Sequence, residues 1–270
     1  MKYSIIFLFS IFLLNLHAQV NREPLFISFD STLIHYNVQG EGKPVILIHG
    51  FISNSNSWNN SALIPSLIKN GYKVITIDLR GNGLSDKPHH LHKYENDAEV
   101  KDIIGLMKKL NFNKYDVIGY SRGAILTARL LVMGKNINKA VIGGMGADFT
   151  NVDWKRRKMF EEAFSGKAHL YPETKGAINY AKSINADTIV LGYLQHVQPT
   201  TTKDQLSKIQ NKVLVISGDQ DTDNGKAEEL AKLIPHSILK TVPGNHNNTA
   251  NTIGFANEVV EFLNGKLQKK

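Results

Sequence analysis

The chain has 270 residues, of which 42% are hydrophobic and 21% are charged, and a chain of this kind can bury a core without a metal or a disulfide. It contains no cysteine, which excludes disulfides, cysteine nucleophiles and thiolate metal sites. The net charge is +8, but the basic residues are scattered and are not interleaved with aromatic residues, so we expect no nucleic-acid partner.

The N-terminal residues 1–18 predict a signal peptide. Lys2 precedes a nearly uninterrupted apolar run over residues 5–14, and the small residue Ala18 follows. This run is too short for a membrane-spanning helix, so we expect cleavage before Gln19 and an exported protein, periplasmic or extracellular. A buried helix or a membrane anchor is the alternative. No later stretch is long and apolar enough to predict stable membrane insertion.

Beyond this segment, short apolar runs alternate with helical patterns. Residues 25–29 and 33–38 predict a hairpin. Nearly continuous apolar runs predict further strands that are buried on both faces, at 45–48, 74–77, 117–118, 141–142 and 213–216. Residues 239–242 predict the end of one more strand. Apolar residues at helical spacing predict helices over 100–110, 125–132 and 259–263. This alternation predicts an α/β fold with a mostly parallel open sheet and helices on both faces.

Residues 146–208 interrupt the alternation. This segment is helical in pattern, amphipathic and rich in aromatic residues. It predicts a small helical lid over the strand ends, inserted between two core segments, 19–145 and 209–270. The alternative is additional core helix with buried aromatic side chains and no role in substrate binding.

Ser121 is the candidate nucleophile. Residues 119–123 read Gly-Tyr-Ser-Arg-Gly, the pattern G-x-S-x-G, between a predicted strand and a predicted helix. A sharp strand-to-helix turn exposes the serine hydroxyl, and the flanking glycines allow the close approach that the turn requires. The helix N-terminus favours negative charge that develops beside the serine.

His246 is the candidate base, because it follows the predicted strand 239–242 and precedes the last helix. It therefore lies on a loop at the same edge of the sheet as the candidate nucleophile. The histidines at 89, 90 and 92 form a polar tract that we expect to be solvated, so we predict no metal site.

Three aspartates compete for the acid that orients the histidine. Asp219, Asp221 and Asp223 all follow the predicted strand 213–216. We expect Asp223 to cap the helix that begins near Gly225. The residues alone leave the choice of the acid open.

With Ser, Asp and His in this chain order, the sequence resembles the α/β-hydrolase family from about residue 33 to residue 263. His49-Gly50-Phe51, followed by Trp58, is similar to the oxyanion loop of that family. Residues 78–88, 218–221 and 243–246 are similar to its further motifs. The resemblance implies that Asp221 is the acid, with Asp219 or Asp223 as alternatives.

The same resemblance implies an oxyanion hole formed by the backbone N–H groups of Phe51 and Arg122. The nucleophile turn is also similar to that of epoxide hydrolases and fluoroacetate dehalogenases, in which aspartate replaces the serine. Those enzymes need a carboxylate to form an alkyl-ester intermediate, and Ser121 cannot supply one. The proline that often follows in that branch is absent, since Ile52 occupies the position.

We therefore predict a serine hydrolase that cleaves a small or medium carboxylic ester through an acyl-enzyme, with no cofactor and no metal. Its expected partner is a small ester-like molecule. The same triad serves amide, peptide, lactone and C–C bond hydrolysis and perhydrolysis, and a non-catalytic ligand-binding protein could keep the fold. Nothing in the sequence predicts an oligomeric state.

Overall fold

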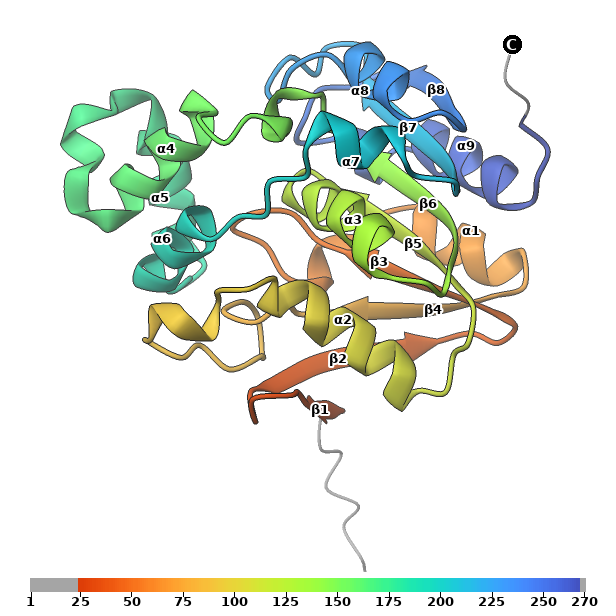
Figure 1. The fold of residues 1–270 in the computed structure, drawn as a ribbon, viewed down its shortest axis with the longest axis horizontal. Coiled ribbons are helices and arrows are strands. Elements are labelled where there is room, and N and C mark those ends of the chain that lie inside the picture. The colour runs from red at the N-terminus through yellow and green to blue at the C-terminus, as the bar shows by residue number, and fades with distance from the viewer. Residues whose placement is uncertain (1–23, 268–270) are drawn as a thin grey trace, which may run out of the picture.

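A computed structural model describes residues 24–267 (Figure 1). The predicted signal peptide, residues 1–18, lies outside the described residues. The strands are β1 (Leu25–Ile27), β2 (Leu33–Gln39), β3 (Lys43–Ile48), β4 (Tyr72–Ile77), β5 (Tyr115–Tyr120), β6 (Ile137–Gly143), β7 (Lys212–Gly218) and β8 (Ser237–Val242).

The α-helices are α1 (Leu63–Lys69), α2 (Ala98–Lys109), α3 (Arg122–Met133), α4 (Lys155–Glu162), α5 (Lys175–Ser183), α6 (Thr188–His196), α7 (Lys203–Ser207), α8 (Ala227–Leu233) and α9 (Ile253–Leu263). Shorter helical segments lie at Ser55–Trp58, Leu91–Lys93, Asp148–Thr150, Ala163–Lys167, Ala168–Leu170, Pro172–Thr174 and Thr249–Asn251.

The strands form one eight-stranded sheet in the order β1-β2-β4-β3-β5-β6-β7-β8. β1 pairs antiparallel with β2, and β2 pairs antiparallel with β4. All further pairs, from β3 with β4 to β7 with β8, are parallel. This confirms the expected hairpin and the mostly parallel sheet.

Helices cover both faces of the sheet, as expected (Figure 1). Alternate residues of β3 point to opposite faces, so that Ile46 and Ile48 join one core cluster while Val45 and Leu47 join the other. The first cluster packs under α2, α3, α7 and α8, and the second packs under α1 and α9. Two buried faces explain why these strands are apolar at nearly every position.

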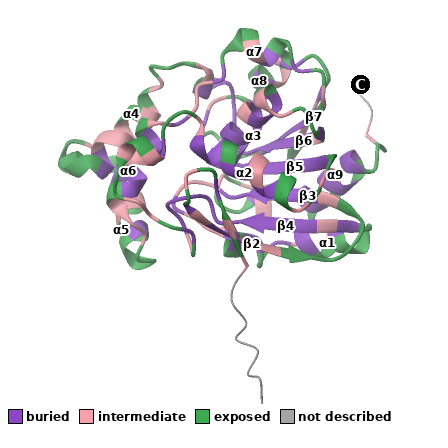
Figure 2. Ribbon diagram, turned by 60° about the horizontal axis from the view of Figure 1, so that its bottom comes forward, coloured by how far each residue is buried: buried purple, intermediate pink, exposed green. Residues whose placement is uncertain are grey.

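The chain between β6 and β7 leaves the sheet, and α4, α5 and α6 lie to one side of it (Figure 1). These helices carry a smaller apolar cluster of their own, which includes Phe164, Val190, Leu191 and Leu194. Much of their surface is exposed or half-buried, whereas the strands β3 to β7 are mostly buried (Figure 2). The boundaries 146–208 of a lid stay a prediction.

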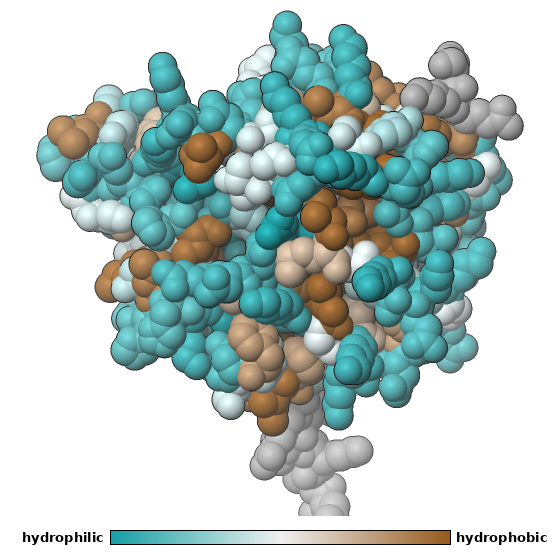
Figure 3. Space-filling model, viewed as in Figure 1, coloured by the Kyte–Doolittle hydropathy of each residue, from teal (hydrophilic) through white to brown (hydrophobic). Residues whose placement is uncertain are grey.

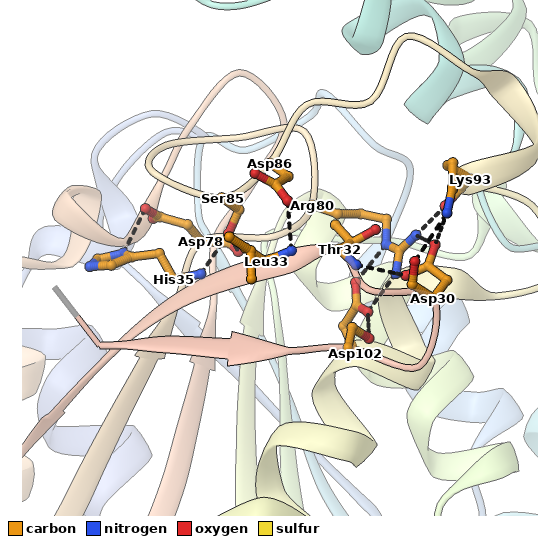
Figure 4. Close-up of polar contacts among 11 residues, drawn as sticks. Asp30, Thr32, Leu33, His35, Asp78, Arg80, Ser85, Asp86, Lys93 and Asp102 are labelled. Carbon is orange, nitrogen blue, oxygen red and sulfur yellow. Dashed lines mark hydrogen bonds and ion pairs between the residues drawn. The ribbon is translucent and has the colours of Figure 1, made fainter. Parts of the chain in front are cut away.

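A buried carboxylate fixes the loops that follow β3 and β4 (Figure 4). Asp78 accepts hydrogen bonds from the backbone N–H groups of Ser55 (2.6 Å) and Leu84 (2.8 Å), and it lies 2.9 Å from Nδ1 of His35. These bonds to the charged form hold the pKa of the Asp78 carboxyl below its usual range although burial raises it. One side chain therefore joins three segments of the chain.

A second network ties the first hairpin to α2 (Figure 4). The fully buried guanidinium of Arg80 donates from Nε and Nη2 to Asp102, at 2.6 Å each, and from Nη1 to Asp30 at 3.2 Å. It also donates to the carbonyl oxygen of Lys93. The motif of residues 78–88 thus has a structural role, because a buried arginine needs such partners.

The face shown in Figure 3 is mostly hydrophilic, and its hydrophobic side chains form separate patches. Within residues 24–267 we find no helix with the length and apolar character that crossing a membrane requires.

Candidate active site

Ser121 lies at a sharp turn between β5 and α3. Its φ of 55° and ψ of −121° are unusual for a residue with a side chain. A Cβ at Gly119 would lie 2.1 Å from the carbonyl oxygen of Gly123, and a Cβ at Gly123 would lie 2.2 Å from that of Ile48. Both glycines are therefore needed for packing, as the sequence pattern indicates.

The structure brings three of the candidate side chains together. Nε2 of His246 lies 2.9 Å from the hydroxyl oxygen of Ser121. Nδ1 of the same ring lies 3.1 Å and 3.0 Å from the two carboxylate oxygens of Asp221. The Asp221 side chain is 3% exposed and the His246 side chain 15%, so the hydrogen-bonded row is open to solvent only at the histidine and serine.

The two neighbouring aspartates have other partners. Asp219 accepts a hydrogen bond from the backbone N–H of Gly244 at 2.9 Å and so holds the loop that carries the histidine. Asp223 lies 3.4 Å from the guanidinium of Arg156. The expected cap by Asp223 is wrong, because α8 begins after Lys226 with no side-chain cap.

Two residues that the sequence patterns did not single out hold the histidine. The hydroxyl of Tyr120 donates to the carbonyl oxygen of His246 at 2.8 Å, and the two rings lie 5.5 Å apart. Burial raises the pKa of the Tyr120 hydroxyl, so it stays a donor. The buried amide of Asn224 donates to the carbonyl of Gly144 at 3.1 Å and lies 3.4 Å from both ring nitrogens of His246.

The predicted oxyanion donors belong to Phe51 and Arg122, which line the same cleft as Ser121. The loop after β3 passes close to it, since a Cβ at Gly50 would lie 3.3 Å from that of Ser121. Among residues 24–267, no carbonyl accepts a hydrogen bond from the backbone N–H of Phe51 or Arg122. Two free donors beside a nucleophile are the groups that stabilise an oxyanion.

His49 shapes this loop through both nitrogens of its ring. Nδ1 lies 2.8 Å from the carbonyl oxygen of Gly50, and Nε2 accepts from the backbone N–H of Leu79 at 3.1 Å. These contacts assign a neutral ring with its proton on Nδ1. Burial lowers the pKa of His49 and agrees with this state.

The side chain of Arg122 points away from the reacting groups. Its guanidinium pairs with Glu99 on α2, at 2.7 Å and 2.5 Å, and also donates to the carbonyl oxygen of Leu194 on α6 at 3.1 Å. Arginine and glutamate are both buried. The residue after the nucleophile therefore joins α2, α3 and α6, a role that the G-x-S-x-G pattern does not reveal.

The serine opens into a cleft of about 850 Å³. Core segments supply one part of its lining and the segment between β6 and β7 supplies the other; the lining includes Phe51, Trp58, Ile125, Met145, Trp154, Arg156, Arg157, Met159, Phe160, Gln195 and Gln198. A neighbouring cavity of about 750 Å³ shares Trp154, Arg156, Met159, Glu173 and Asp223 with it. The lining combines aromatic surface with a few polar groups, as is usual for small-molecule sites.

The histidine tract contributes no metal cluster in the described part of the chain. His89 pairs with Asp187 at 2.6 Å, and the rings of His90 and His92 stack.

A hydroxyl, an imidazole and a carboxylate thus lie in a row at the carboxyl edge of the parallel strands. An imidazole in this position can accept the serine proton, and a buried carboxylate can stabilise the resulting imidazolium.

The sequence is similar to a known protein family and to individual proteins of known name. The family model described as alpha/beta hydrolase fold matches residues 43–146. A non-heme chloroperoxidase from Streptomyces lividans is 26% identical over 250 residues, which cover 80% of this chain and 89% of the relative.

Solved structures resemble the whole fold. A bromoperoxidase from Bacillus anthracis matches with a TM-score of 0.67 at 25% identity, covering 86% of this chain and 96% of the other. An esterase from Exiguobacterium antarcticum matches with a TM-score of 0.71 at 21% identity, covering 91% and 99%. The expected fold is confirmed by these matches and by the sheet described above. The chain has the alpha/beta hydrolase fold, and its residues 43–146 match the model of that fold.

Proposed function

We propose that this protein is a serine hydrolase that cleaves a small or medium carboxylic ester through an acyl-enzyme intermediate. The observation that carries the proposal is the row of hydrogen bonds from Ser121 through His246 to Asp221, at 2.9 Å and 3.0 Å. A half-buried serine in a strained turn, hydrogen-bonded to an imidazole, is the arrangement of an activated nucleophile.

In this mechanism the Ser121 hydroxyl attacks the carbonyl carbon of the ester while His246 takes its proton. The negative charge on the carbonyl oxygen is stabilised by the backbone N–H groups of Phe51 and Arg122. His246 then returns the proton to the departing alcohol. Water, deprotonated by His246, attacks the acyl-enzyme and releases the carboxylic acid and the free serine.

The test is the turnover of 4-nitrophenyl butyrate by Ser121→Ala. We expect kcat to fall by at least about a thousandfold, because the nucleophile is removed while the cleft is kept. A fluorophosphonate probe should label the wild-type protein at Ser121 and leave the variant unlabelled. Wild-type turnover by the variant contradicts the mechanism, and failure to label the wild type favours a non-catalytic ligand-binding protein.

Perhydrolysis is a second candidate, favoured by the similarity to a chloroperoxidase across 89% of its length. Here hydrogen peroxide replaces water in the second step, so that the acyl group leaves the serine as a peracid. An assay of 4-nitrophenyl acetate with added peroxide, with the peracid detected by bromide oxidation, separates this reaction from plain hydrolysis.

We also propose that the protein is exported and that residues 146–208 act as a lid. Support for export comes only from the sequence of residues 1–18. The mass of the protein recovered from its native source tests it, because cleavage removes those residues and leaves Gln19 as the first residue.

A further inference from the structure

One wall of the cleft is polar in a way that the ester mechanism does not use. It consists of Arg157 on α4, Gln195 near the end of α6, and Gln198 just beyond that helix, and we call these three residues the polar wall. All three line the cleft that contains Ser121.

The glutamine side chains are the first unusual feature of the wall. Gln195 is 5% exposed and Gln198 is 6% exposed. Within residues 24–267 neither amide group has a hydrogen-bond partner, although both line the cleft. The amide atoms are not among the buried polar atoms that lack a partner in the described residues, so they face the open cleft, where they can hydrogen-bond to water or to a ligand.

Arg157 adds a positive charge to the same place. Its guanidinium donates to the carbonyl oxygen of His196 at 3.2 Å and lies 3.4 Å from the hydroxyl of Thr200. Its buried Nε has no partner among the described residues. Since His196 and Thr200 lie beside the two glutamines in the chain, the three groups form one cluster.

Arg157 makes no close ion pair of the kind that its neighbours make, although after Lys158 its charge also helps to lower the pKa of the exposed Asp153 carboxyl. Arg122 pairs with Glu99, Arg156 with Asp223, and Lys158 with Asp153. For Arg157, the ion pairs of residues 24–267 include no carboxylate partner. The exposed Glu173 also lines the cleft, where water screens its charge.

The polar wall and Ser121 line the same cleft of about 850 Å³. A cleft of that volume is the size that holds one small molecule. A ligand group held by the wall would therefore belong to the same small molecule that presents its ester to the nucleophile.

We propose that the polar wall binds a carboxylate of the substrate, so that the preferred esters carry a carboxylate on their acyl or alcohol part. This inference rests on the proposed ester hydrolysis. A guanidinium and two amides offer several N–H donors and one positive charge. A carboxylate can accept these hydrogen bonds and pair with the charge, whereas a hydrocarbon chain can do neither. The aromatic lining contacts the rest of the molecule.

The experiment compares two matched pairs of substrates on each protein. On the acyl side, the mono-4-nitrophenyl ester of adipic acid is compared with 4-nitrophenyl hexanoate. On the alcohol side, 3-carboxyphenyl butyrate is compared with phenyl butyrate. The measured quantity is the ratio of kcat/KM for the charged ester to that for the neutral ester. Both substrates of a pair are assayed with the same protein preparation, so a smaller fraction of folded protein lowers both kcat/KM values equally and leaves their ratio unchanged.

We expect the wild type to prefer the charged ester in one pair by about tenfold or more, the size of a charge-assisted hydrogen bond. Arg157→Gln should bring that ratio to about one. Gln195→Met and Gln198→Met should each lower it about threefold to tenfold. Lys158→Gln removes a charge from the solvent side of the same helix and should leave the ratio unchanged.

A ratio of one or less in both pairs for the wild type overturns the inference, and so does a ratio that Arg157→Gln does not change. Ser121→Ala separates this failure from failure of the proposed function. If that variant loses turnover of all four esters while the wild-type ratios stay at one, only the polar wall is misassigned. If it keeps turnover, the proposed hydrolysis itself is wrong.

Discussion

At the scale of single residues, the candidate site depends on small differences in position. Asp219, Asp221 and Asp223 lie within one turn after β7, yet only Asp221 has its carboxylate against the imidazole of His246. Asp219 supports the backbone at Gly244. The three side chains are chemically identical, and they differ in role only because each contacts a different part of the structure.

We predict that Asp221→Asn lowers kcat for 4-nitrophenyl butyrate by about ten-thousandfold, because an amide cannot stabilise the protonated imidazole. Asp219→Asn should cost less than about tenfold, since the Gly244 N–H keeps a carbonyl acceptor. Asp223→Asn should have the smallest effect, because this side chain is exposed. An equal loss in Asp219→Asn or Asp223→Asn argues for a different acid.

The sequence was most informative where the course of the backbone restricts the residue type, as at a tight turn or at the end of a strand. The glycines around Ser121, and the predicted strands that end before Asp221 and His246, predicted that these three side chains lie at one edge of the sheet. The structure brings them together there. Asp221 could be chosen only by family resemblance. Gln195, Gln198 and Asn224 follow no pattern of spacing, because their places beside the cleft and His246 arise only when distant segments come together in the fold.

At the scale of elements, the strand-to-helix turn at the serine has no spare volume. A Cβ at Gly123 would lie 2.2 Å from the carbonyl oxygen of Ile48 on β3. β3 and β5 are paired neighbours, so that helix α3 begins in contact with the backbone of the adjacent strand. Helix α5, by contrast, contains a glycine with open space around it.

We predict that Gly123→Ala destabilises the protein by at least about 3 kcal/mol or prevents folding, because the clash is with backbone and not with a flexible side chain. Gly176→Ala on α5, where nothing lies within 4 Å of the added Cβ, should stabilise it by up to about 1 kcal/mol. Urea unfolding followed by circular dichroism measures both. Equal effects of the two changes would contradict the packing argument.

The buried pair of Arg122 and Glu99 joins α3 to α2. We predict that Arg122→Met alone destabilises the protein by about 3–5 kcal/mol, because it leaves the Glu99 carboxylate buried and unpaired. Arg122→Met combined with Glu99→Leu should recover most of that loss. Chemical denaturation of the wild type, the two single variants and the double variant gives the interaction free energy between Arg122 and Glu99. A double variant as unstable as the sum of the singles rules out the pair as the cause.

Elements with strong apolar patterns were predicted well, and short ones were not. The helix expected over 100–110 is α2 (Ala98–Lys109), and that over 125–132 is α3 (Arg122–Met133). The seven-residue α1 (Leu63–Lys69) went unpredicted, because helical spacing of apolar residues stands out only over a window of about 11 residues or more. The cap expected from Asp223 failed because α8 starts later than the turn suggested.

At the scale of the whole molecule, stability depends on pH through a buried histidine. Burial lowers the pKa of His49 from its usual 6.5, and both ring nitrogens are occupied in the neutral form. Between the folded and unfolded pKa values, the unfolded chain binds the extra proton. The contribution of His49 is therefore fully present above about pH 6.5 and is lost as the pH falls toward the folded pKa.

We predict that the free energy of unfolding falls by up to about 1.4 kcal/mol per pH unit below about pH 6.5 on account of His49. Other groups titrate in the same range, so the difference between the wild type and His49→Gln isolates the effect. The amide can donate to Gly50 and accept from Leu79 without titrating. Identical slopes for the wild type and His49→Gln would exclude this origin.

Two separate parts of the chain line the cleft, the core segments and the segment between β6 and β7. This division has a consequence for how the choice of ligand can change. Ser121, Asp221 and His246 follow β5, β7 and β8, whereas Arg157, Gln195 and Gln198 belong to the segment between β6 and β7. We therefore expect substitutions in that segment to change which molecules enter the cleft while the hydrogen-bonded row of Ser121, His246 and Asp221 stays in place.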